Sequence, residues 1–172
     1  MDEGIDKART GLSAEMYVEY GIAMYQAQVL EFRVAQLLGV ALTADKKFGS
    51  QDELDQAHKA NQLVTLGMLM HRLVPHIDGT SLLSELRAAL ATRNNLAHAF
   101  FGAHEANMET PAGQDSMIDE ALAAQHEFHA VMRSMIPVLA SFLDTIGAAP
   151  DDHIPGLGEK IQLLLSNQRD IS

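Results

Sequence analysis

The sequence predicts an all-α protein, an antiparallel bundle of four main helices with a short C-terminal helix. Four segments place apolar residues at alternating steps of three and four, the spacing that keeps one face of an α-helix apolar. No segment shows the strict apolar–polar alternation of a half-buried strand. Short connections separate the four segments, and short connections favour antiparallel neighbours.

The first two helices are predicted over residues 13–42 and 51–74. The apolar stripe of the first consists of Tyr20, Met24, Ala27, Leu30, Val34, Leu37 and Ala41. The second follows a capping-box pattern, Ser50 to Glu53, with Leu54 directly after it. Its seam consists of Leu63, Leu66, Met70 and Leu73. Pro75 and the Asp78-Gly79 pair are expected to end the helix and form a turn.

The third and fourth helices are predicted over residues 81–101 and 115–146. Thr80 or Ser81 is expected to cap the third helix. Residues 102–113 are expected to form a loop. The inward positions of the fourth helix are Ile118, Ala121, Leu122, Phe128, Met132, Met135, Leu139 and Phe142. Pro137 falls inside this pattern, and we expect it to kink or split the helix.

The whole chain, residues 1–172, is predicted to form a single domain with its core in residues 13–146. Residues 147–158 are rich in proline and glycine and are expected to be a surface linker. The terminal segment, residues 159–168, holds a short predicted helix that either packs through its apolar residues or frays.

The composition limits the classes of site. The chain has no cysteine, which excludes disulfides, thiolate metal ligands and a cysteine nucleophile. The N-terminal residues are polar, unlike a signal peptide, and no apolar run approaches the ~18 residues of a membrane span, so a cytoplasmic location without membrane contact is expected.

The net charge of -11 argues against broad, non-specific nucleic-acid binding, which needs a basic face. Residues 81–104 are the exception, because Arg87 and Arg93 stand there against Glu85 and give a net charge of +1. A local anion site is compatible with that stretch.

The third predicted helix carries a polar interruption in its apolar seam. The seam is Leu82, Leu86, Ala89, Arg93, Leu96 and Phe100, in steps of four and three. Arg93 therefore occupies a position where the spacing asks for an apolar side chain. Asn94 interrupts the neighbouring row, and His98 lies one turn after Asn94 on the helix surface.

A half-buried arginine is costly unless an anionic group meets it. One interpretation is structural: Arg93 pairs with a carboxylate of another helix, such as Glu31, and His98 is a packing histidine. The other is functional: the groups are held to meet a ligand phosphate or a partner subunit. Glu31 would then orient Arg93 from across the bundle.

The segment Arg93-Asn-Asn-Leu-Ala-His98 resembles the Arg-x4-6-His motif of HEPN domains, in which a polar residue commonly follows the arginine. The helical architecture over residues 13–146 is also similar. The resemblance implies a metal-independent RNA endonuclease that needs no cofactor. His98 would take a proton from a ribose 2′-hydroxyl, Arg93 would bind the phosphate, and Asn94 would orient His98 or donate to the phosphate.

The resemblance also implies a homodimer in which two motifs face one cleft, and a toxin that pairs with a small nucleotidyltransferase-type antitoxin. The residues favour a dimer as well, because side chains five residues apart point ~140° apart around a helix. Phe100 or Phe101, expected to be exposed, would help to seal the interface.

Two other hypotheses stay open. The chain is either a non-catalytic helical binding module of the same fold, or a purely structural bundle with Arg93 in an ion pair. A metal site is not expected, because His126 and His129 lack the glutamate spacing of bundle metal sites and read as a solvated or interface edge.

Overall fold

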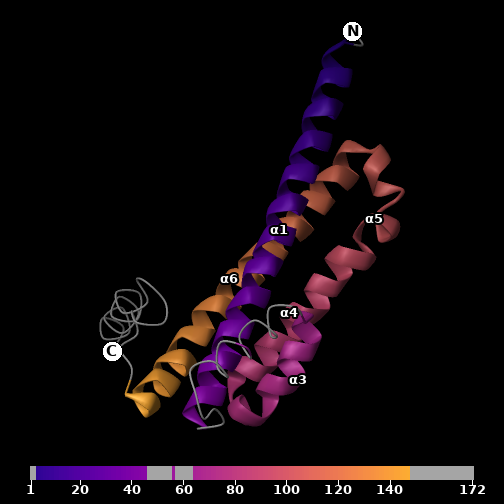
Figure 1. The fold of residues 1–172 in the computed structure, drawn as a ribbon. Helices are drawn as coiled ribbons and strands as arrows, with labels where there is room; N and C mark the ends of the chain where they lie inside the picture. Colours follow the sequence, from indigo (N-terminus) through magenta and orange to yellow (C-terminus); the bar gives the residue numbers. More distant parts are fainter. Residues whose placement is uncertain (1–2, 46–55, 57–63, 148–172) are drawn as a thin grey trace. The chain divides into compact units, whose positions relative to one another are not determined.

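The computed structural model describes residues 3–45, 56 and 64–147, with side chains from Ser13 onward. Within these ranges every regular element is a helix and no strand occurs, which confirms the all-α prediction. The elements are α1 (Glu3–Ala44), α3 (Leu66–Ile77), α4 (Ser81–His98), α5 (Phe100–Ala103), the 3-10 helix η1 (Asn107–Glu109) and α6 (Pro111–Ile146) (Figure 1).

Helix α1 carries the predicted apolar stripe. It begins ten residues before the predicted start at Ser13 and ends at Ala44. The central and C-terminal members of the stripe are at most 1% exposed: Ala27, Leu30, Val34, Leu37 and Ala41. Tyr20 and Met24 are half-buried. The 3.6-residue period therefore identified the buried face of the helix.

The segment Ser13–Ala44 of α1 is long and apolar enough to cross a membrane by length and composition, with a mean hydropathy of 1.2 over its best window. This corrects the expectation that no stretch approaches that length. Half of the window is buried inside the protein, a property that it shares with core helices of globular proteins.

The second predicted helix, over residues 51–74, is interrupted within the described residues, and its predicted end is wrong; Gln56 is helical as predicted, and the predicted start lies outside the described residues. Val64 and Thr65 are not helical, and α3 begins only at Leu66. At the other end α3 continues through Pro75 to Ile77. Pro75 is exposed, so its ring faces solvent, and burial of Leu73 and Ile77 holds the last turn despite the missing backbone donor.

The predicted turn after α3 is confirmed, because Gly79 adopts a φ of 79°, a left-handed conformation that glycine accepts without strain. The capping box at Ser50–Glu53, the seam residue Leu63, residues 148–158 of the linker and the terminal helix lie outside the described residues.

The third predicted helix is divided. Helix α4 ends at His98, Ala99 leaves helical geometry with a φ of −124°, and α5 begins at Phe100. The Thr80 hydroxyl donates to the carbonyl oxygen of Ile77 at 2.6 Å, a bond that closes the turn before α4.

Helix α6 begins four residues before its predicted start and includes part of the predicted loop. Pro111 takes the first helical position, where its missing donor costs nothing. The Thr110 hydroxyl accepts the backbone N–H of Gly113 at 3.1 Å, an N-cap bond that favours this start. Pro137 lies inside α6 without splitting it.

The chain forms two compact units, and the first comprises residues 1–31 and 84–131. In it, contacts join α1 to α4 through Tyr20 and Leu96, and α1 to α6 through Glu19 and Gln125. Its core is built from Met16, Ala23, Ala27, Leu30, Leu86, Ala89, Leu96, Phe100, Met117, Ile118, Ala121, Ala124, Phe128 and Val131. All of the sequence-predicted site residues belong to this unit.

The second unit comprises residues 32–83 and 132–172. Its described core is built from Val34, Ala35, Leu37, Leu38, Val40, Ala41, Leu66, Leu69, Met70, Leu73, Ile77, Leu82, Leu83, Met135, Leu139 and Leu143. His76 Nδ1 lies 3.0 Å from Asp45 Oδ2, which ties α3 to the end of α1.

Candidate functional site

Arg93 sits in the buried seam of α4 but keeps its head partly in solvent. Its seam neighbours Ala89 and Leu96 are 0% and 2% exposed, whereas the Arg93 side chain is 24% exposed. Its Nη2 lies 3.7 Å from Oε2 of Glu31 on α1, whose side chain is 23% exposed. A charge-assisted N–H···O bond is usually ~2.7–2.9 Å long, so this is a loose ion pair.

Asn94 is exposed and contacts the arginine beside it. Arg93 Nη1 donates to Asn94 Oδ1 at 3.3 Å. The structure therefore brings Arg93, Asn94 and Glu31 together, in the contact that both the structural and the functional interpretation expect. Because a guanidinium has five N–H donors, these two contacts do not exhaust its capacity to bind an anion.

His98 is the last residue of α4, and it is exposed. Its imidazole has no hydrogen-bond or ion-pair partner among the described residues, so both ring nitrogens are accessible. Since α4 is helical from Arg93 to His98, the two side chains point ~140° apart. One chain does not bring Arg93 and His98 together.

The end of α4 is anchored to α1 by an aromatic cluster. Tyr20 stacks on Phe100 with ring centroids 5.1 Å apart and lies 4.7 Å from Phe101. Phe100 is 1% exposed, so the expectation of an exposed Phe100 at an interface is wrong; it packs against Tyr20, Phe101 and His104. Phe101 is half-buried.

The hydroxyl of Tyr20 also donates to the carbonyl oxygen of Leu96 at 3.1 Å. Leu96 lies in the last turn of α4, where carbonyls lose their intrahelical partners. This bond therefore satisfies a polar group at the helix end and fixes the turn that carries His98.

Tyr20→Phe should lower the free energy of unfolding by about 0.5–1.5 kcal/mol, because it removes this bond and leaves the rings packed. Urea denaturation followed by circular dichroism measures the change. Tyr25→Phe is the matched control, since Tyr25 is 66% exposed and its hydroxyl has no partner among the described residues. Equal effects of the two variants would contradict the anchoring role.

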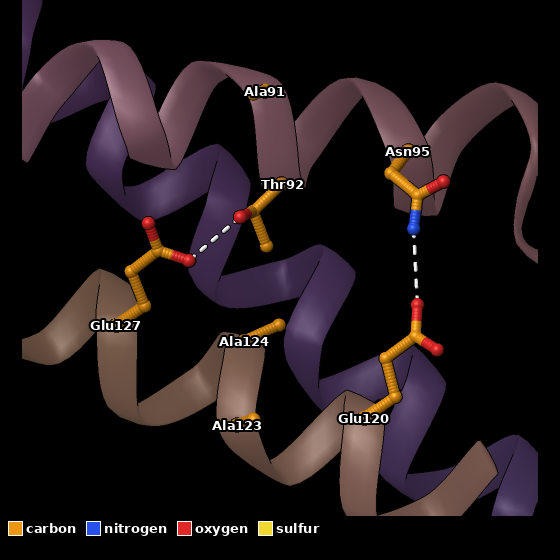
Figure 2. Close-up of a pocket in the computed structure, with 7 residues that line it drawn as sticks. All are labelled: Ala91, Thr92, Asn95, Glu120, Ala123, Ala124 and Glu127. Atoms are coloured by element: carbon orange, nitrogen blue, oxygen red, sulfur yellow. Dashed lines mark hydrogen bonds between the residues drawn. The ribbon is translucent and has the colours of Figure 1, made fainter.

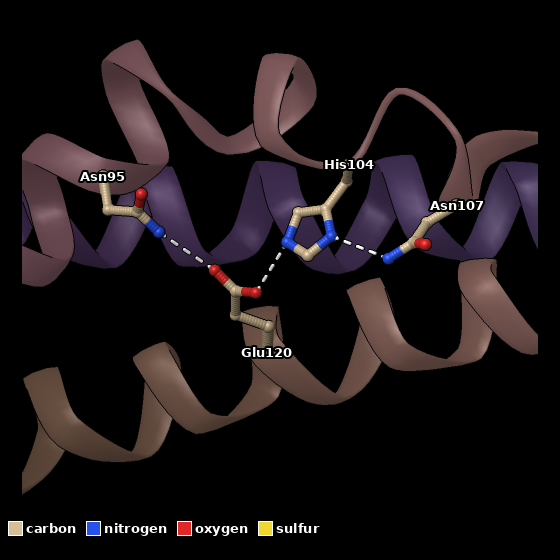
Figure 3. Close-up of polar contacts among 4 residues, drawn as sticks. All are labelled: Asn95, His104, Asn107 and Glu120. Carbon is tan, nitrogen blue, oxygen red and sulfur yellow. Dashed lines mark hydrogen bonds and ion pairs between the residues drawn. The ribbon is translucent and has the colours of Figure 1, made fainter.

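A second polar cluster, which the sequence did not reveal, joins α6 to α4 and to the segment after α4 (Figure 3). Glu120 on α6 accepts from Asn95 Nδ2 at 3.0 Å and lies 2.7 Å from His104 Nε2. His104 Nδ1 lies 2.9 Å from Asn107 Nδ2. Because the amide donates to Nδ1, the proton of the neutral imidazole sits on Nε2 and is donated to the carboxylate.

Both ring nitrogens of His104 are therefore occupied, in contrast to those of His98. A histidine can act as a general base only through a free ring nitrogen. His104 instead clamps the turn before η1 onto Glu120 of α6. Its partners lie 3 and 16 residues away, and no periodic signal in the sequence links them.

A shallow pocket of about 400 Å³ lies between α4 and α6 beside this cluster (Figure 2). Thr92 and Asn95 point from α4 toward Glu127 and Glu120 on α6, and Ala91, Ala123 and Ala124 complete the lining. The Thr92 hydroxyl donates to Glu127 Oε2 at 2.6 Å. The two carboxylates make this pocket unsuited to phosphate, so an anion would be met at Arg93 and not here.

Among the residues that the structure describes, no group of three or more His, Asp and Glu side chains is arranged to hold a metal ion. His126 and His129 are exposed on α6, as predicted. No protein-family model matches the chain, and no curated protein or solved structure is significantly similar to it.

Proposed function

We propose that this protein is an HEPN-like, metal-independent endoribonuclease. The observation that carries the proposal is the state of His98: an exposed imidazole with both ring nitrogens accessible, one helical turn after Asn94 and five residues after a half-buried arginine. His126 and His129 are also exposed, but only His98 stands five residues after an arginine in the motif spacing, and His104 is held by hydrogen bonds.

In the proposed reaction, the neutral imidazole of His98 takes the proton of a ribose 2′-hydroxyl. The oxygen attacks the adjacent phosphorus, and the bond from phosphorus to the 5′-oxygen breaks. The imidazolium returns its proton to the leaving 5′-oxygen. The products are a 2′,3′-cyclic phosphate and a 5′-hydroxyl, and the reaction requires no cofactor.

Arg93 is the proposed phosphate ligand, because its planar, permanently charged fork matches phosphate oxygens. Its ion pair with Glu31 is long at 3.7 Å, which suits a carboxylate that orients the guanidinium and leaves donors for a second anion. Asn94, in contact with Arg93, is placed to donate to the same phosphate or to orient His98.

The proposed enzyme has a specific helical architecture, oligomeric state and biological setting. We propose an antiparallel bundle of four main helices that acts as a cytoplasmic homodimer, because Arg93 and His98 diverge on one chain and a second copy supplies the missing group. In the toxin–antitoxin setting of the resembled family, a nucleotidyltransferase-type antitoxin would restrain it. No membrane partner is proposed.

A second candidate is a non-catalytic binding module of the same fold. The Arg93–Glu31 pair favours it, because the carboxylate already compensates the charge that a phosphate would meet, and the net charge of -11 opposes RNA binding. In that case Arg93→Met would leave stability unchanged or raise it, since an apolar residue replaces a half-buried ion pair.

The two candidates differ in a single assay. Purified protein is incubated with total RNA in EDTA, and the cleavage ends are mapped. The RNase proposal expects cleavage that survives chelation and leaves 2′,3′-cyclic phosphate ends, together with growth arrest when wild type is induced in cells. Intact RNA and normal growth with a folded protein would reject it in favour of the binding module. Arg93→Met then reports whether Arg93 serves only stability.

A further inference from the structure

The outward face of α1 between Ala14 and Val29 has an unusual composition for a strongly acidic protein. The positions that point away from the buried residues of α1 are Ala14, Val18, Gly21, Ile22, Tyr25, Gln28 and Val29. None of them is charged. Four large apolar side chains on α1 in this unit are open to solvent: Tyr17 at 51%, Val18 at 56%, Ile22 at 38% and Tyr25 at 66% exposed.

The spacing on this face is that of a helix-pairing seam. Val18, Ile22, Tyr25 and Val29 follow one another in steps of four, three and four, as the a and d positions of a coiled coil do. Gly21 stands beside the seam, and a Cβ added to it would meet no atom within 4 Å. The backbone of a second helix can therefore approach closely there.

We propose that this face binds the same face of a second copy of the chain, with the two α1 helices antiparallel. In an isologous contact both copies use the same surface, so if one residue contacts a second residue of the other copy, the second residue of the first copy also contacts the first residue of the other. In the antiparallel register Ile22 meets Tyr25 of the second copy and Val18 meets its Val29, so every seam position is matched.

The charge distribution of the chain favours this occupant. Two chains of net charge -11 repel one another, and an uncharged face is where they can meet at the lowest electrostatic cost. A basic partner would find no carboxylate on the seam. A membrane-surface helix carries Lys and Arg along its polar face, whereas α1 from Ser13 to Phe32 contains no lysine or arginine and three glutamates.

The surface area that the two copies can bury determines how tightly they are expected to bind. An aromatic side chain buries about 150–250 Å² when fully covered, so the exposed fractions of Tyr17 and Tyr25 supply ~200 Å² of the ~800 Å² per partner in a standard interface. The dimer is therefore expected to depend on concentration. The face lies away from α4, which α1 contacts through Tyr20 and Glu31, so this contact is separate from the one that would bring Arg93 and His98 of two copies together in the proposed function.

Analytical ultracentrifugation of the full chain over a range of concentrations tests the inference. Wild type should dimerise, and Ile22→Glu or Tyr25→Glu should weaken the dimer by about 100-fold, because a carboxylate would then be buried against an apolar side chain of the second copy. Met68→Glu is the control, since Met68 is an equally exposed apolar residue on α3, at 51%. Circular dichroism verifies that all three variants fold.

A cross-linking experiment tests the direction of the helices. The chain contains no cysteine, so single Val18→Cys and Val29→Cys chains can be joined by a short bifunctional maleimide. In the antiparallel register Val18 lies opposite Val29 of the second copy and ~16 Å along the helix axis from the second Val18. The antiparallel register expects the mixture of the two variants to cross-link and each variant alone to cross-link poorly. Efficient cross-linking of each variant with itself would overturn that register.

A wild type that stays monomeric at every concentration, or a dimer that Ile22→Glu and Tyr25→Glu do not affect, would overturn the inference. RNA cleavage is measured separately on the same samples. A chain that dimerises through this face without cleaving RNA refutes only the RNase proposal. A chain that cleaves RNA as a monomer refutes the interface and the two-copy active site, but not the RNase activity.

Discussion

His98→Ala should reduce the rate of RNA cleavage by about 10²–10⁴-fold, the contribution that a positioned general acid–base residue makes. The fold should be unaffected, because His98 is exposed and no described residue depends on it for a hydrogen bond or an ion pair. Growth arrest on induction should disappear with the activity. The initial rate on a defined RNA in EDTA and the integrity of total cellular RNA measure the two effects.

The matched control is His129→Ala, which removes an exposed histidine from α6. It should cleave RNA at the wild-type rate. His104→Ala provides a second contrast, because it removes the clamp on Glu120 and should lower stability more than it lowers the rate per folded molecule. Equal cleavage by wild type and His98→Ala would remove His98 from the mechanism and with it the main support for the RNase proposal.

Local periodicity explains which parts of the fold could be predicted. The buried faces of α1, α4 and α6 follow from apolar residues at helical spacing, and Leu30, Leu86 and Phe128 are all 0% exposed. The same pattern identified Arg93 as a polar interruption, because the helical spacing places its position in line with the buried apolar residues of α4. Glu31 was the predicted partner and lies 3.7 Å from it.

The errors occur where tertiary contacts override local signals. Pro75 predicted the end of α3, but burial of Ile77 extends the helix beyond it. The residues around Ala99 give no sequence signal that predicts the break between α4 and α5. The break coincides with the stacking of Tyr20 on Phe100, a contact between residues 80 positions apart along the chain.

The cluster around Glu120 escaped prediction for a related reason. Glu120 is joined to Asn95 and His104, which lie 25 and 16 residues away, and none of the three breaks an apolar seam. A polar residue on a half-exposed face looks the same in the sequence whether or not it has a partner. Such a cluster is visible only once α4 and α6 are placed side by side.

Gly113→Ala should lower the free energy of unfolding by about 1–3 kcal/mol, the usual cost of forcing extra volume into a packed site. A Cβ on Gly113 would lie 2.7 Å from the backbone carbonyl carbon of Asn107 and closer still to its oxygen. Backbone atoms cannot rotate away as the end of a side chain does. The added methyl group would therefore push η1 away from the first turn of α6. Urea denaturation and thermal melting measure the loss.

Gly102→Ala is the control, because Gly102 is exposed on α5 and an added Cβ there meets nothing within 4 Å. It should change the stability by no more than about 0.5 kcal/mol. The displacement caused by Gly113→Ala should also separate Asn107 from His104, since these side chains are joined at 2.9 Å. The His104 imidazole resonances, observed by NMR, should therefore shift in Gly113→Ala and not in Gly102→Ala. Unchanged stability and resonances in Gly113→Ala would show that η1 does not pack on α6 at this point, and the clamp on Glu120 would then lack its support.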